Sequence, residues 1–411
     1  MKERVAIVVG GGPAPGINGV ISAATVEAIR NGMEVIGLLD GFKWLFRGDT
    51  TKTMKLTLEN AWPVHSTGGS ILRISRNFPD NPEESFKAMV KALKALKINH
   101  LITIGGDGTA YVAREIDKRT KGVISVVHVP KTIDNDLPLP GGAPTFGFET
   151  ARHWGTGIVR NIIQDARTTS RWYFVTTMGR HAGHLALSIG KAAGATLTLI
   201  PEEFKDKKLK FSKVADVLEG SIIKRMAKGY SYGVAILAEG VAAKIDPEEL
   251  AKYANLEKDE RGDLRLSEIQ MGRIMQYYLQ DQLKARGINI KAVHKTIGYE
   301  LRAADPIPFD AEYTRNLGFS AVNQLMKGRG GVMVTYFEGK LKPIPLAKII
   351  DPATKRTRVR YVDIKADPYI VGKHYMVRLD KDDFSSGKIT KLAKAGKMSP
   401  NEFRKRFSYL V

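Results

Sequence analysis

Short apolar runs alternate with longer amphipathic segments along most of the chain. The β-branched run from Val5 to Val9 predicts a strand, and the pattern from about Asn18 to Arg30 predicts a helix after it. The run from Glu34 to Leu39 predicts a second strand. A glycine-rich turn, Gly10 to Gly16, separates the first strand from the helix. This order is typical of a strand, helix and strand unit in a parallel sheet.

The same alternation continues through the rest of the sequence. Asn81 is a predicted helix N-cap, because Pro82 follows it at the first helical position and Glu84 at the third. Helical patterns cover Gly183–Ala193 and Leu264–Gly287. Further apolar runs predict strands at His100–Ile104, Val123–Val129, Tyr173–Thr177, Thr196–Ile200 and Gly233–Ala238. We therefore expect an α/β protein, with two Rossmann-like lobes whose mainly parallel sheets are covered by helices.

Length and composition set limits on this picture. A chain of 411 residues exceeds what one core usually organises, and we expect lobe boundaries near 142, 300 and 345. The absence of cysteine excludes disulfides, thiolate nucleophiles and Cys-ligated metals, so any metal is expected on oxygen or imidazole. No apolar run approaches the roughly 20 residues of a membrane span, and the first residues lack a signal-peptide pattern. We expect a cytoplasmic protein without a membrane partner.

The charge is strongly positive. Lys and Arg number 64 against 43 Asp and Glu, which gives a formal net charge of +21. Such a field attracts polyanions of any kind. The basic residues are dispersed, with local concentrations only at Lys355–Arg360 and Arg404–Arg406. We expect solvated surface at both clusters, with contact to phosphate or nucleic acid as the alternative.

Three clusters of glycine and aspartate begin where an apolar run stops. In a parallel sheet the carboxyl ends of the strands form the ligand crevice, so these clusters are candidates for one site. Gly10–Gly12 lets backbone N–H groups approach a phosphate, although a plain tight turn explains it equally well. Gly105–Thr109 adds a carboxylate, Asp107, suited to Mg²⁺, with an Asx-turn as the alternative. Pro130–Asp136 carries two further acids, one of which is suited to act as a base, with two aspartates in a surface turn as the alternative.

Together with motifs further along the chain, these clusters resemble the 6-phosphofructokinases. The resemblance covers roughly residues 4 to 340 and rests on six motifs in the same order. They are Gly11–Gly16, Gly105–Thr109, Pro130–Asp136, Met178–Arg180, Pro201–Glu203 and Ala238–Gly240. It implies transfer of a phosphoryl group to the 1-hydroxyl of fructose 6-phosphate, giving fructose 1,6-bisphosphate in glycolysis.

The resemblance also implies a division of the chain. Residues 1–142 plus about 301–345 correspond to the lobe that binds the phosphoryl donor and Mg²⁺, and residues 143–300 to the lobe that binds fructose 6-phosphate. The active site is expected in the cleft between them. Residues 346–411 form an extension beyond the short bacterial enzymes, expected to pack on the lobes.

Site residues are carried over by matching motifs. Asp134 matches the general base, and the other residues expected to take part in catalysis are Thr132, Asp136, Arg180 and Lys131. Asp107 matches the carboxylate associated with Mg²⁺, and the Gly11 N–H is expected to bind the donor phosphate. The full set expected to bind the donor is Gly11, Arg76, Asn77, Gly106, Asp107, Gly108 and Thr109.

The sugar-phosphate site is assigned in the same way. Glu239 matches a carboxylate that accepts sugar hydroxyls, and Arg171 matches an arginine that reaches in from a neighbouring subunit. The expected set is Thr132, Asp134, Arg171, Met178, Gly179, Arg180, Glu239, Tyr299 and Arg302. A site shared in this way predicts a dimer or tetramer with a nearly inactive monomer. Tyr299 stands where allosteric bacterial members have histidine, so the sequence gives no basis for predicting an effector.

Two positions that correlate with donor choice in the family disagree here. Gly108 leaves room for the α-phosphate of a nucleotide, where a carboxylate would occupy and repel it. Lys131, like the lysine of pyrophosphate-using members, neutralises a terminal phosphate of either donor. We favour ATP, with a pyrophosphate-dependent fructose 6-phosphate 1-phosphotransferase as the alternative.

Two remoter functions share single features with the chain. NAD kinases and lipid kinases contain the Gly-Gly-Asp-Gly-Thr pentapeptide, but nothing that corresponds to Lys131–Asp136 followed by Met178–Arg180. A basic nucleic-acid-binding protein would explain the charge, yet no docking module or aromatic-interleaved basic run is present. We expect no nucleic-acid partner.

Overall fold

The computed structural model describes residues 2–76, 81–206, 208–257, 264–349, 351, 354 and 357–411. It divides into two compact units. The first contains residues 1–151 and 299–360, and the second contains residues 152–298 and 361–411. The sequence predicts boundaries near 142, 300 and 345, and the structure has them after residues 151, 298 and 360.

The first unit is built on a seven-stranded sheet with the order β11-β10-β5-β4-β1-β2-β3. The pairs β1–β2, β1–β4, β4–β5 and β5–β10 are parallel, and only the outer pairs β2–β3 and β10–β11 are antiparallel. The strands are β1 (Arg4–Val9), β2 (Glu34–Leu38), β3 (Thr53–Leu56), β4 (His100–Gly105), β5 (Ser125–Pro130), β10 (Val332–Phe337) and β11 (Lys340–Pro345).

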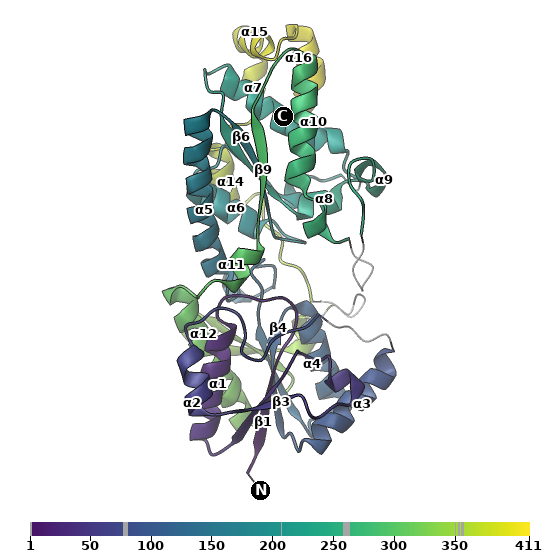
Figure 1. The fold of residues 1–411 in the computed structure, drawn as a ribbon, viewed down its shortest axis with the longest axis vertical. Helices are drawn as coiled ribbons and strands as arrows, with labels where there is room; N and C mark the ends of the chain where they lie inside the picture. Colours follow the sequence, from purple (N-terminus) through teal and green to yellow (C-terminus); the bar gives the residue numbers. More distant parts are fainter. Residues whose placement is uncertain are drawn as a thin grey trace. The chain divides into compact units, whose positions relative to one another are not determined.

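Helices cover both faces of this sheet, because its central strands are buried on both sides. Figure 1 shows α1 and α12 together on one side of the strands, and α3 and α4 on the other. A core on the α3 and α4 side joins Phe86 and Ile116 to alternate residues of the strands, such as Ala6 and Val8. The helices are α1 (Ile17–Arg30), α2 (Leu58–Ala61), α3 (Pro82–Ala95), α4 (Asp107–Thr120), α11 (Tyr299–Ala303), α12 (Pro308–Met326) and α13 (Leu346–Ile349).

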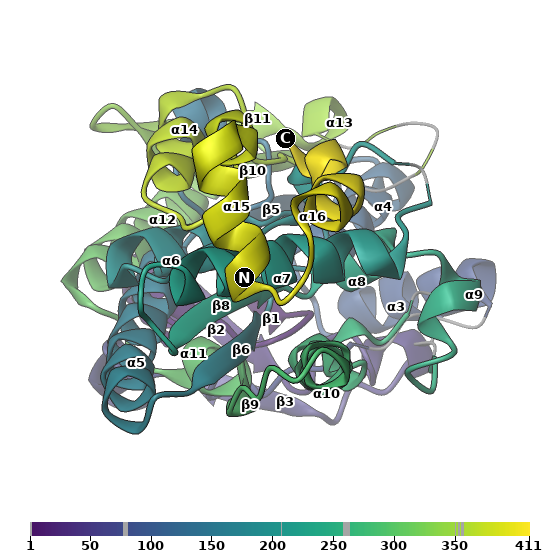
Figure 2. The same cartoon turned by 90° about the horizontal axis from the view of Figure 1, so that it is seen from above.

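The second unit contains a four-stranded parallel sheet with the order β7-β8-β6-β9. Its strands are β6 (Trp172–Thr177), β7 (Leu197–Leu199), β8 (Gly233–Ala238) and β9 (Ala292–Ile297). Figure 2 shows α6 and α7 on one face of this sheet and α5 and α10 on the other. The helices are α5 (Phe148–Thr169, which begins in the first unit), α6 (His184–Ala193), α7 (Phe211–Met226), α8 (Gly240–Lys244), α9 (Pro247–Leu250), α10 (Met271–Ala285), α14 (Asp367–His374), α15 (Ser386–Ala395) and α16 (Pro400–Phe407).

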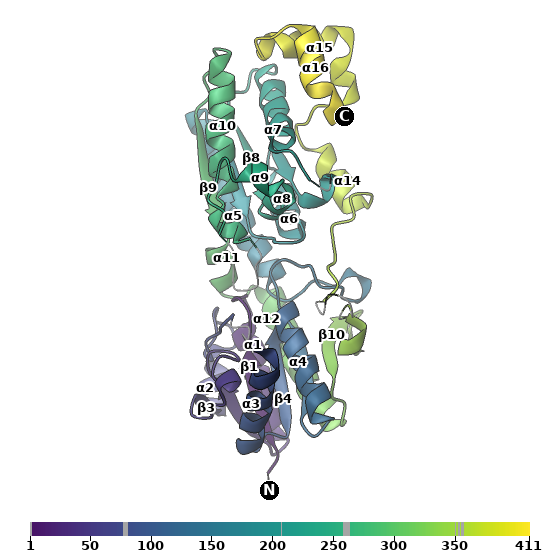
Figure 3. The ribbon, with the colours of Figure 1, turned by 90° about the vertical axis from the view of Figure 1, so that its right-hand side faces the viewer.

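The last residues of the chain form a second layer over α6 and α7. Helix α14 contacts α6, and α15 and α16 contact α7, as Figure 3 shows. Phe403 and Phe407 are fully buried in a cluster that includes Ile223 of α7. Arg406 donates a hydrogen bond to the buried Glu219 at 2.6 Å. The expectation of solvated surface is therefore wrong for Arg406, whose charge is paired with a carboxylate of α7.

The expected secondary structure is confirmed in most places. The Asn81 side chain accepts a hydrogen bond from the Glu84 N–H, which confirms the predicted cap of α3. The helix expected over Leu264–Gly287 is interrupted, because Gln270 adopts a left-handed conformation (φ +48°) and α10 begins only at Met271. None of the helices described is both long and apolar enough to cross a bilayer. The α/β class with parallel sheets covered by helices is confirmed.

Candidate active site

The three glycine and aspartate clusters follow three neighbouring parallel strands of the first unit. They come after β1, β4 and β5, which lie side by side in the sheet. The chain leaves β1 toward β2 on one side, while β4 and β5 lie on the other side. Ligands of open α/β sheets bind at such a point, where the strand order reverses. The fold thus brings together the clusters that the sequence predicts as one site.

A group of cations surrounds the turn after β1. Lys131 is only 4% exposed, and its Nζ donates a hydrogen bond to the carbonyl oxygen of Gly12. A Cβ built on Gly12 would lie 2.9 Å from Arg76 Nη2 and 3.2 Å from Arg302 Nη1. Burial lowers the pKa of Lys131 to about 7, and the charges of Arg76 and Arg302 contribute to the shift. Three cations around bare backbone form a cradle suited to a highly charged anion.

The role expected for the Gly11 N–H is not the one observed. This N–H donates a hydrogen bond to the carbonyl oxygen of Ser75 at 3.1 Å, so it is already paired. Gly11 has a left-handed backbone (φ +86°), and a Cβ built there would lie 3.4 Å from Lys131 Nζ. The glycine therefore leaves space beside the ammonium group, and the expected binding of the donor by its N–H stays a prediction.

The cluster after β4 forms the first turn of α4. Gly106 is the N-cap residue in an extended conformation, and Asp107 is the first residue of the helix. The Gly108 N–H donates to Asp107 Oδ1 at 2.6 Å, a contact between adjacent residues, whereas an Asx-turn would engage the N–H two residues on. Thr109 is buried against the backbone of Gly10. This packing joins the first turn of α4 to the loop after β1.

A group of carboxylates lies next to the cationic cradle. Burial raises the pKa of Asp136 to about 7, and the negative charges of Asp134 and Asp107 raise it further. The same two carboxylates raise the pKa of Lys131, whereas Arg76 and Arg302 lower it. Asp136 therefore lies close enough to Asp134 and Asp107 to be repelled by both, and the charge of Arg360 partly offsets this repulsion.

These residues fit a magnesium ion that arrives with a phosphate ligand. Among the residues that the structure describes, no group of three or more His, Asp or Glu is arranged to hold a metal by itself. Mg²⁺ seldom needs such a cage, since it uses one or two carboxylates and completes its shell with water and phosphate oxygens. Asp107, with the mutually repelling Asp134 and Asp136 nearby, offers oxygen donors of this kind.

The loop after β5 is held by a dense set of hydrogen bonds. Thr132 Oγ1 accepts from the Asp134 N–H at 3.0 Å, and the Thr132 carbonyl accepts from Thr145 Oγ1 at 2.7 Å. Asn135, between the two aspartates, has a left-handed backbone (φ +56°). Arg360 donates to the Asn135 carbonyl from both Nε (3.1 Å) and Nη2 (2.8 Å). The geometry of Asp134 and Asp136 thus depends on contacts distant in sequence.

Arg360 is a residue of this site that the sequence reasoning missed. It belongs to the basic cluster Lys355–Arg360, which we expected to be solvated. Within the extended segment Thr357–Arg360, Arg358 is exposed, whereas Arg360 is partly buried against the Asn135 loop. Alternation in an extended segment would turn Arg358 and Arg360 to the same side, so the sequence carried no local signal that separates the two arginines. Lys355 and Arg356 lie outside the described residues.

The second unit brings together four of the nine residues expected to bind the sugar phosphate. Met178, Gly179 and Arg180 follow β6, and Glu239 follows the neighbouring strand β8. The Gly179 N–H donates to Glu239 Oε1 at 3.3 Å, and the Gly240 N–H donates to the Gly179 carbonyl at 3.1 Å. The loops after β6 and β8 are therefore joined, with Glu239 at the junction.

Glu202 strengthens this arrangement. Its carboxylate accepts hydrogen bonds from the N–H groups of Gly183 and Val362, each at 2.9 Å. Gly183 precedes α6, and Val362 belongs to the segment that follows Arg360. The Pro201–Glu203 motif thus ties the loop after β6 to the last part of the chain.

Arg171 is not brought to the same place. It immediately precedes β6, whereas Met178 immediately follows it, so the strand separates them by about 20 Å. Its guanidinium lies 3.8 Å from Asp165. Arg171 is therefore remote from the Met178–Arg180 loop of its own chain, and its expected role in a neighbouring subunit stays a prediction.

The remaining predicted residues belong to the first unit. The Arg302 guanidinium lies 4.5 Å from the centre of the Tyr299 ring, which is 55% exposed. Arg302, expected to bind the sugar phosphate, lies beside Gly12 and Arg76, which were expected to bind the donor. Asn77, expected to bind the donor, lies outside the described residues.

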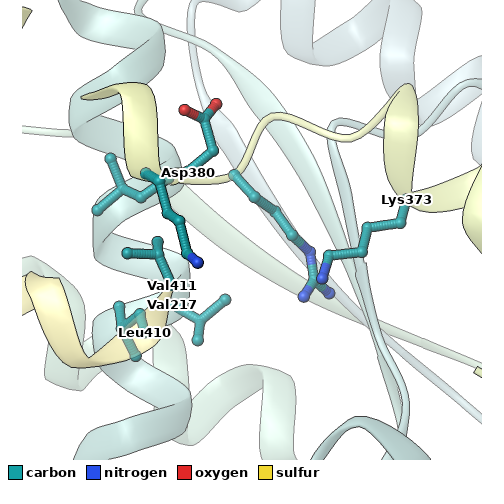
Figure 4. A pocket seen from close by; sticks show the side chains of 8 residues that line it. Val217, Lys373, Asp380, Leu410 and Val411 are labelled. Atoms are coloured by element: carbon teal, nitrogen blue, oxygen red, sulfur yellow. The ribbon is translucent and has the colours of Figure 1, made fainter. Parts of the chain in front are cut away.

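A separate cavity of about 280 Å³ is present in the second unit. Figure 4 shows Val217, Leu410 and Val411 along one side and Lys373 on the opposite side. Arg378 and Asp380 also line it. Arg378 pairs with Glu203 at 2.6 Å and Asp380 with Lys224 at 2.8 Å. None of the predicted site residues that the structure describes lines this cavity, so it is not the candidate active site.

Comparison with known proteins places the chain among phosphofructokinases. The phosphofructokinase family profile matches residues 4–325. A pyrophosphate–fructose 6-phosphate 1-phosphotransferase of Thermotoga maritima is 52% identical over 99% of this chain and 98% of its own length. An enzyme of the same name from Naegleria fowleri is 45% identical over 98% of this chain and 95% of its own length. An ATP-dependent 6-phosphofructokinase of Chloroflexus aggregans is 31% identical over 84% of this chain and 91% of its own length.

Solved structures support the same fold. A pyrophosphate-dependent phosphofructokinase from Marinobacter aquaeolei matches 97% of this chain and 92% of its own, with a TM-score of 0.68 and 16% identity. A phosphofructokinase from Saccharomyces cerevisiae matches 99% of this chain with a TM-score of 0.66 and 21% identity. The chain spans 50% of the length of that yeast protein.

Proposed function

Because the chain belongs to the phosphofructokinase family, we propose that it transfers a phosphoryl group from inorganic pyrophosphate to the 1-hydroxyl of fructose 6-phosphate. The products are fructose 1,6-bisphosphate and orthophosphate. The observation that carries the choice of donor is the high identity to relatives named for pyrophosphate, at 52% and 45%, against 31% for a relative named for ATP. The residues alone favoured ATP, and the relatives support the alternative better.

The cationic cradle supports this donor on physical grounds. Pyrophosphate is small and highly charged, so nearly all of its binding energy must come from cations and N–H groups close to its oxygens. Lys131, Arg76 and Arg302 surround the backbone of Gly11 and Gly12 within one unit. A compact donor needs no further surface for a base and ribose, and the buried ammonium of Lys131 lies where a terminal phosphate is expected.

Asp134 acts as the base in this proposal. Its carboxylate accepts the proton of the 1-hydroxyl while that oxygen forms a bond to the nearer phosphorus. The bond from that phosphorus to the bridging oxygen breaks, and orthophosphate leaves. Thr132 fixes the backbone of Asp134 through the Asp134 N–H, and Asn135 and Arg360 fix the residues after it. Positioning and charge neutralisation contribute most of the rate enhancement in phosphoryl transfer.

Magnesium, held by Asp107, would neutralise phosphate charge in this reaction. Met178, Gly179, Arg180 and Glu239 are proposed to bind the sugar phosphate, together with Tyr299. Arg302 lies beside the cradle, so its proposed partner is a phosphate group of either substrate. Self-association into a dimer or tetramer, with Arg171 reaching a neighbour's site, remains part of the proposal.

ATP is the second candidate donor, and Gly108 is the residue that favours it. A carboxylate at this position would repel the α-phosphate of a nucleotide, and Gly108 removes that repulsion. Replacing Gly108 with Asp, which a donor without an α-phosphate tolerates, tests this point. The substitution is expected to abolish any ATP use and to leave pyrophosphate use largely intact.

The deciding experiment supplies purified protein with fructose 6-phosphate, Mg²⁺ and either pyrophosphate or ATP, and follows fructose 1,6-bisphosphate. We expect kcat/KM for pyrophosphate to exceed that for ATP by at least about tenfold, a difference of about 1.4 kcal/mol in transition-state binding. A preference for ATP would favour the second candidate. Absence of product with both donors would contradict the assignment as a fructose 6-phosphate phosphotransferase.

A further inference from the structure

Arg360 makes an unusually complete set of contacts with the loop that carries Asp134 and Asp136. Its Nε and Nη2 donate to the Asn135 carbonyl at 3.1 and 2.8 Å, and Nη2 also donates to Asn135 Oδ1. Its Nη1 donates to the Ala143 carbonyl at 3.1 Å. Its own backbone N–H donates to the Asp136 carbonyl at 2.7 Å. One residue therefore holds both ends of the segment from 135 to 143.

The groups that Arg360 satisfies are the ones this loop cannot satisfy through regular structure. Asn135 is 8% exposed and has a left-handed backbone, and its carbonyl accepts from the Arg360 side chain instead of from a strand or helix. A buried carbonyl without a partner costs about 1–3 kcal/mol. Asn135 Oδ1 also accepts from the Thr145 N–H at 3.0 Å, which extends the network to the far side of the loop. Removal of the guanidinium would expose several acceptors at once.

We propose that Arg360 is a positioning residue for the phosphoryl transfer: its guanidinium fixes the left-handed turn at Asn135 and so sets the direction of Asp134. This inference rests on the proposed function. Without the guanidinium the loop would relax, since the buried Asn135 carbonyl and amide oxygen would lose the donor that Arg360 supplies. A planar guanidinium suits the task, because its fork bonds two carbonyl groups and the Asn135 amide oxygen simultaneously. Lysine offers a single ammonium group and cannot reproduce this pattern.

Arg360 lies outside the region that defines the family. The family profile ends at residue 325, and Arg360 comes 35 residues later, in the part of the chain that follows β11. It is also the last residue of the first unit, directly before the chain enters the second. The positioning role is thus supplied by a segment to which the resemblance assigned nothing.

Two variants test the proposal. R360K keeps a positive charge but loses the fork, and R358K is the matched control, because Arg358 is exposed in the same segment. We expect R360K to lower kcat by about 10²-fold, as displacement of a reacting group by about 1 Å does. The KM values for fructose 6-phosphate and the donor should change little, since Arg360 touches neither substrate in this proposal. R358K should retain the wild-type kcat.

Hydrogen exchange of the loop provides a readout that does not depend on activity. Peptides covering residues 131–146 should exchange faster in R360K than in the wild type or R358K, and the rest of the first unit should not. A second variant, R360A, should recover part of its kcat and of its loop protection when millimolar guanidinium is added. A general loss of folding would not be rescued in this way.

Activity and loop exchange together decide the proposal. A lowered kcat with faster loop exchange and guanidinium rescue supports the proposal. Wild-type kcat in R360K overturns it, and so does a lowered kcat with unchanged loop exchange. If the wild-type protein shows no turnover with either donor, the proposed function fails, and loop exchange decides alone. Faster exchange in R360K then supports the clamp on Asn135, and unchanged exchange overturns it.

Discussion

Lys131 donates a hydrogen bond to the carbonyl oxygen of Gly12, which joins the loop after β5 to the turn after β1. The two residues are far apart in sequence, and the parallel order of β1, β4 and β5 brings them together. The contact places a buried ammonium group beside the backbone that is proposed to receive the donor phosphate. Burial and the nearby Arg76 and Arg302 lower its pKa to about 7, so an incoming anion would favour the protonated form.

Replacing Lys131 with Met is expected to damage pyrophosphate use more than folding. The variant keeps most of the length of the side chain but removes the charge that is proposed to neutralise the terminal phosphate. Loss of one such group lowers kcat/KM by about 10²–10³-fold in comparable sites. K118M, at an exposed position in the last turn of α4, should behave like the wild type. Wild-type kinetics in K131M would contradict the role given to this residue.

Because His128 is buried, we expect the stability of the fold to depend on pH, independently of the reaction. It is fully buried in β5 with its Nδ1 at 2.9 Å from Thr103 Oγ1, and burial lowers its pKa to about 3. The unfolded chain binds a proton near pH 6.5, and the folded chain does so only near pH 3. Neutral His128 therefore imposes no penalty above pH 6.5, and folding loses stability as the pH falls from 6.5 toward 3.

The size of this effect is measurable at mildly acidic pH. Between pH 7.5 and pH 5 the free energy of unfolding of the wild type should fall by about 2 kcal/mol more than that of H128N, because the unfolded histidine is mostly protonated at pH 5. Denaturant unfolding at pH 7.5 and pH 5 for both proteins gives the difference. H153N, which replaces an exposed histidine, should keep the wild-type dependence. Equal losses in H128N and the wild type would show that His128 is protonated in the folded state.

The sequence was informative where a local pattern decides the structure. The Asn81 cap, the strands of both sheets and the gathering of three loops at one edge all follow from residues close together in the chain. It did not reveal contacts between residues that are distant in the chain. Gly11 was expected to offer its N–H to phosphate, but the Ser75 carbonyl occupies that N–H. The break before Met271 depends on a left-handed Gln270, which is a conformation that sequence seldom signals in a residue other than glycine.

Arg360 and Arg406 illustrate the same limit for charged residues. Both lie in basic clusters for which solvated surface is the simplest interpretation. Their partners are Asn135 and Glu219, which are 225 and 187 residues away. No local pattern marks an arginine that bonds inward, because the acceptor becomes available only after the units have folded. For the donor, Gly108 led us to favour ATP and Lys131 suits either donor, whereas the relatives named for pyrophosphate support the alternative better.

We expect substitution of Glu219 to cause a large loss of stability. It is fully buried on α7, and its two carboxylate oxygens accept hydrogen bonds from Arg286 and Arg406. E219Q would remove the anion of Arg286 and leave Arg406 with Asp216 at 3.3 Å, and breaking a buried pair in this way costs about 3–5 kcal/mol. Denaturant unfolding should show the loss at unchanged m-value. The exposed pair between Lys388 and Asp382 is the control, since D382N should cost less than about 1 kcal/mol.

Arg171 and Asp134 together test whether sites are shared between subunits. D134N should lower kcat by about 10²–10⁴-fold, because the amide cannot accept the proton. R171A should also be impaired if the arginine serves a neighbour's site. In a mixed oligomer of the two variants, one site combines Asp134 of one chain with Arg171 of another, so activity should rise above that of either variant. R171A mixed with the R171A/D134N double variant should show no rise, because no chain supplies Arg171. If mass spectrometry confirms hybrids of R171A and D134N and activity does not recover, each site is completed within one chain, and the position of Arg171 ahead of β6 makes it a structural residue.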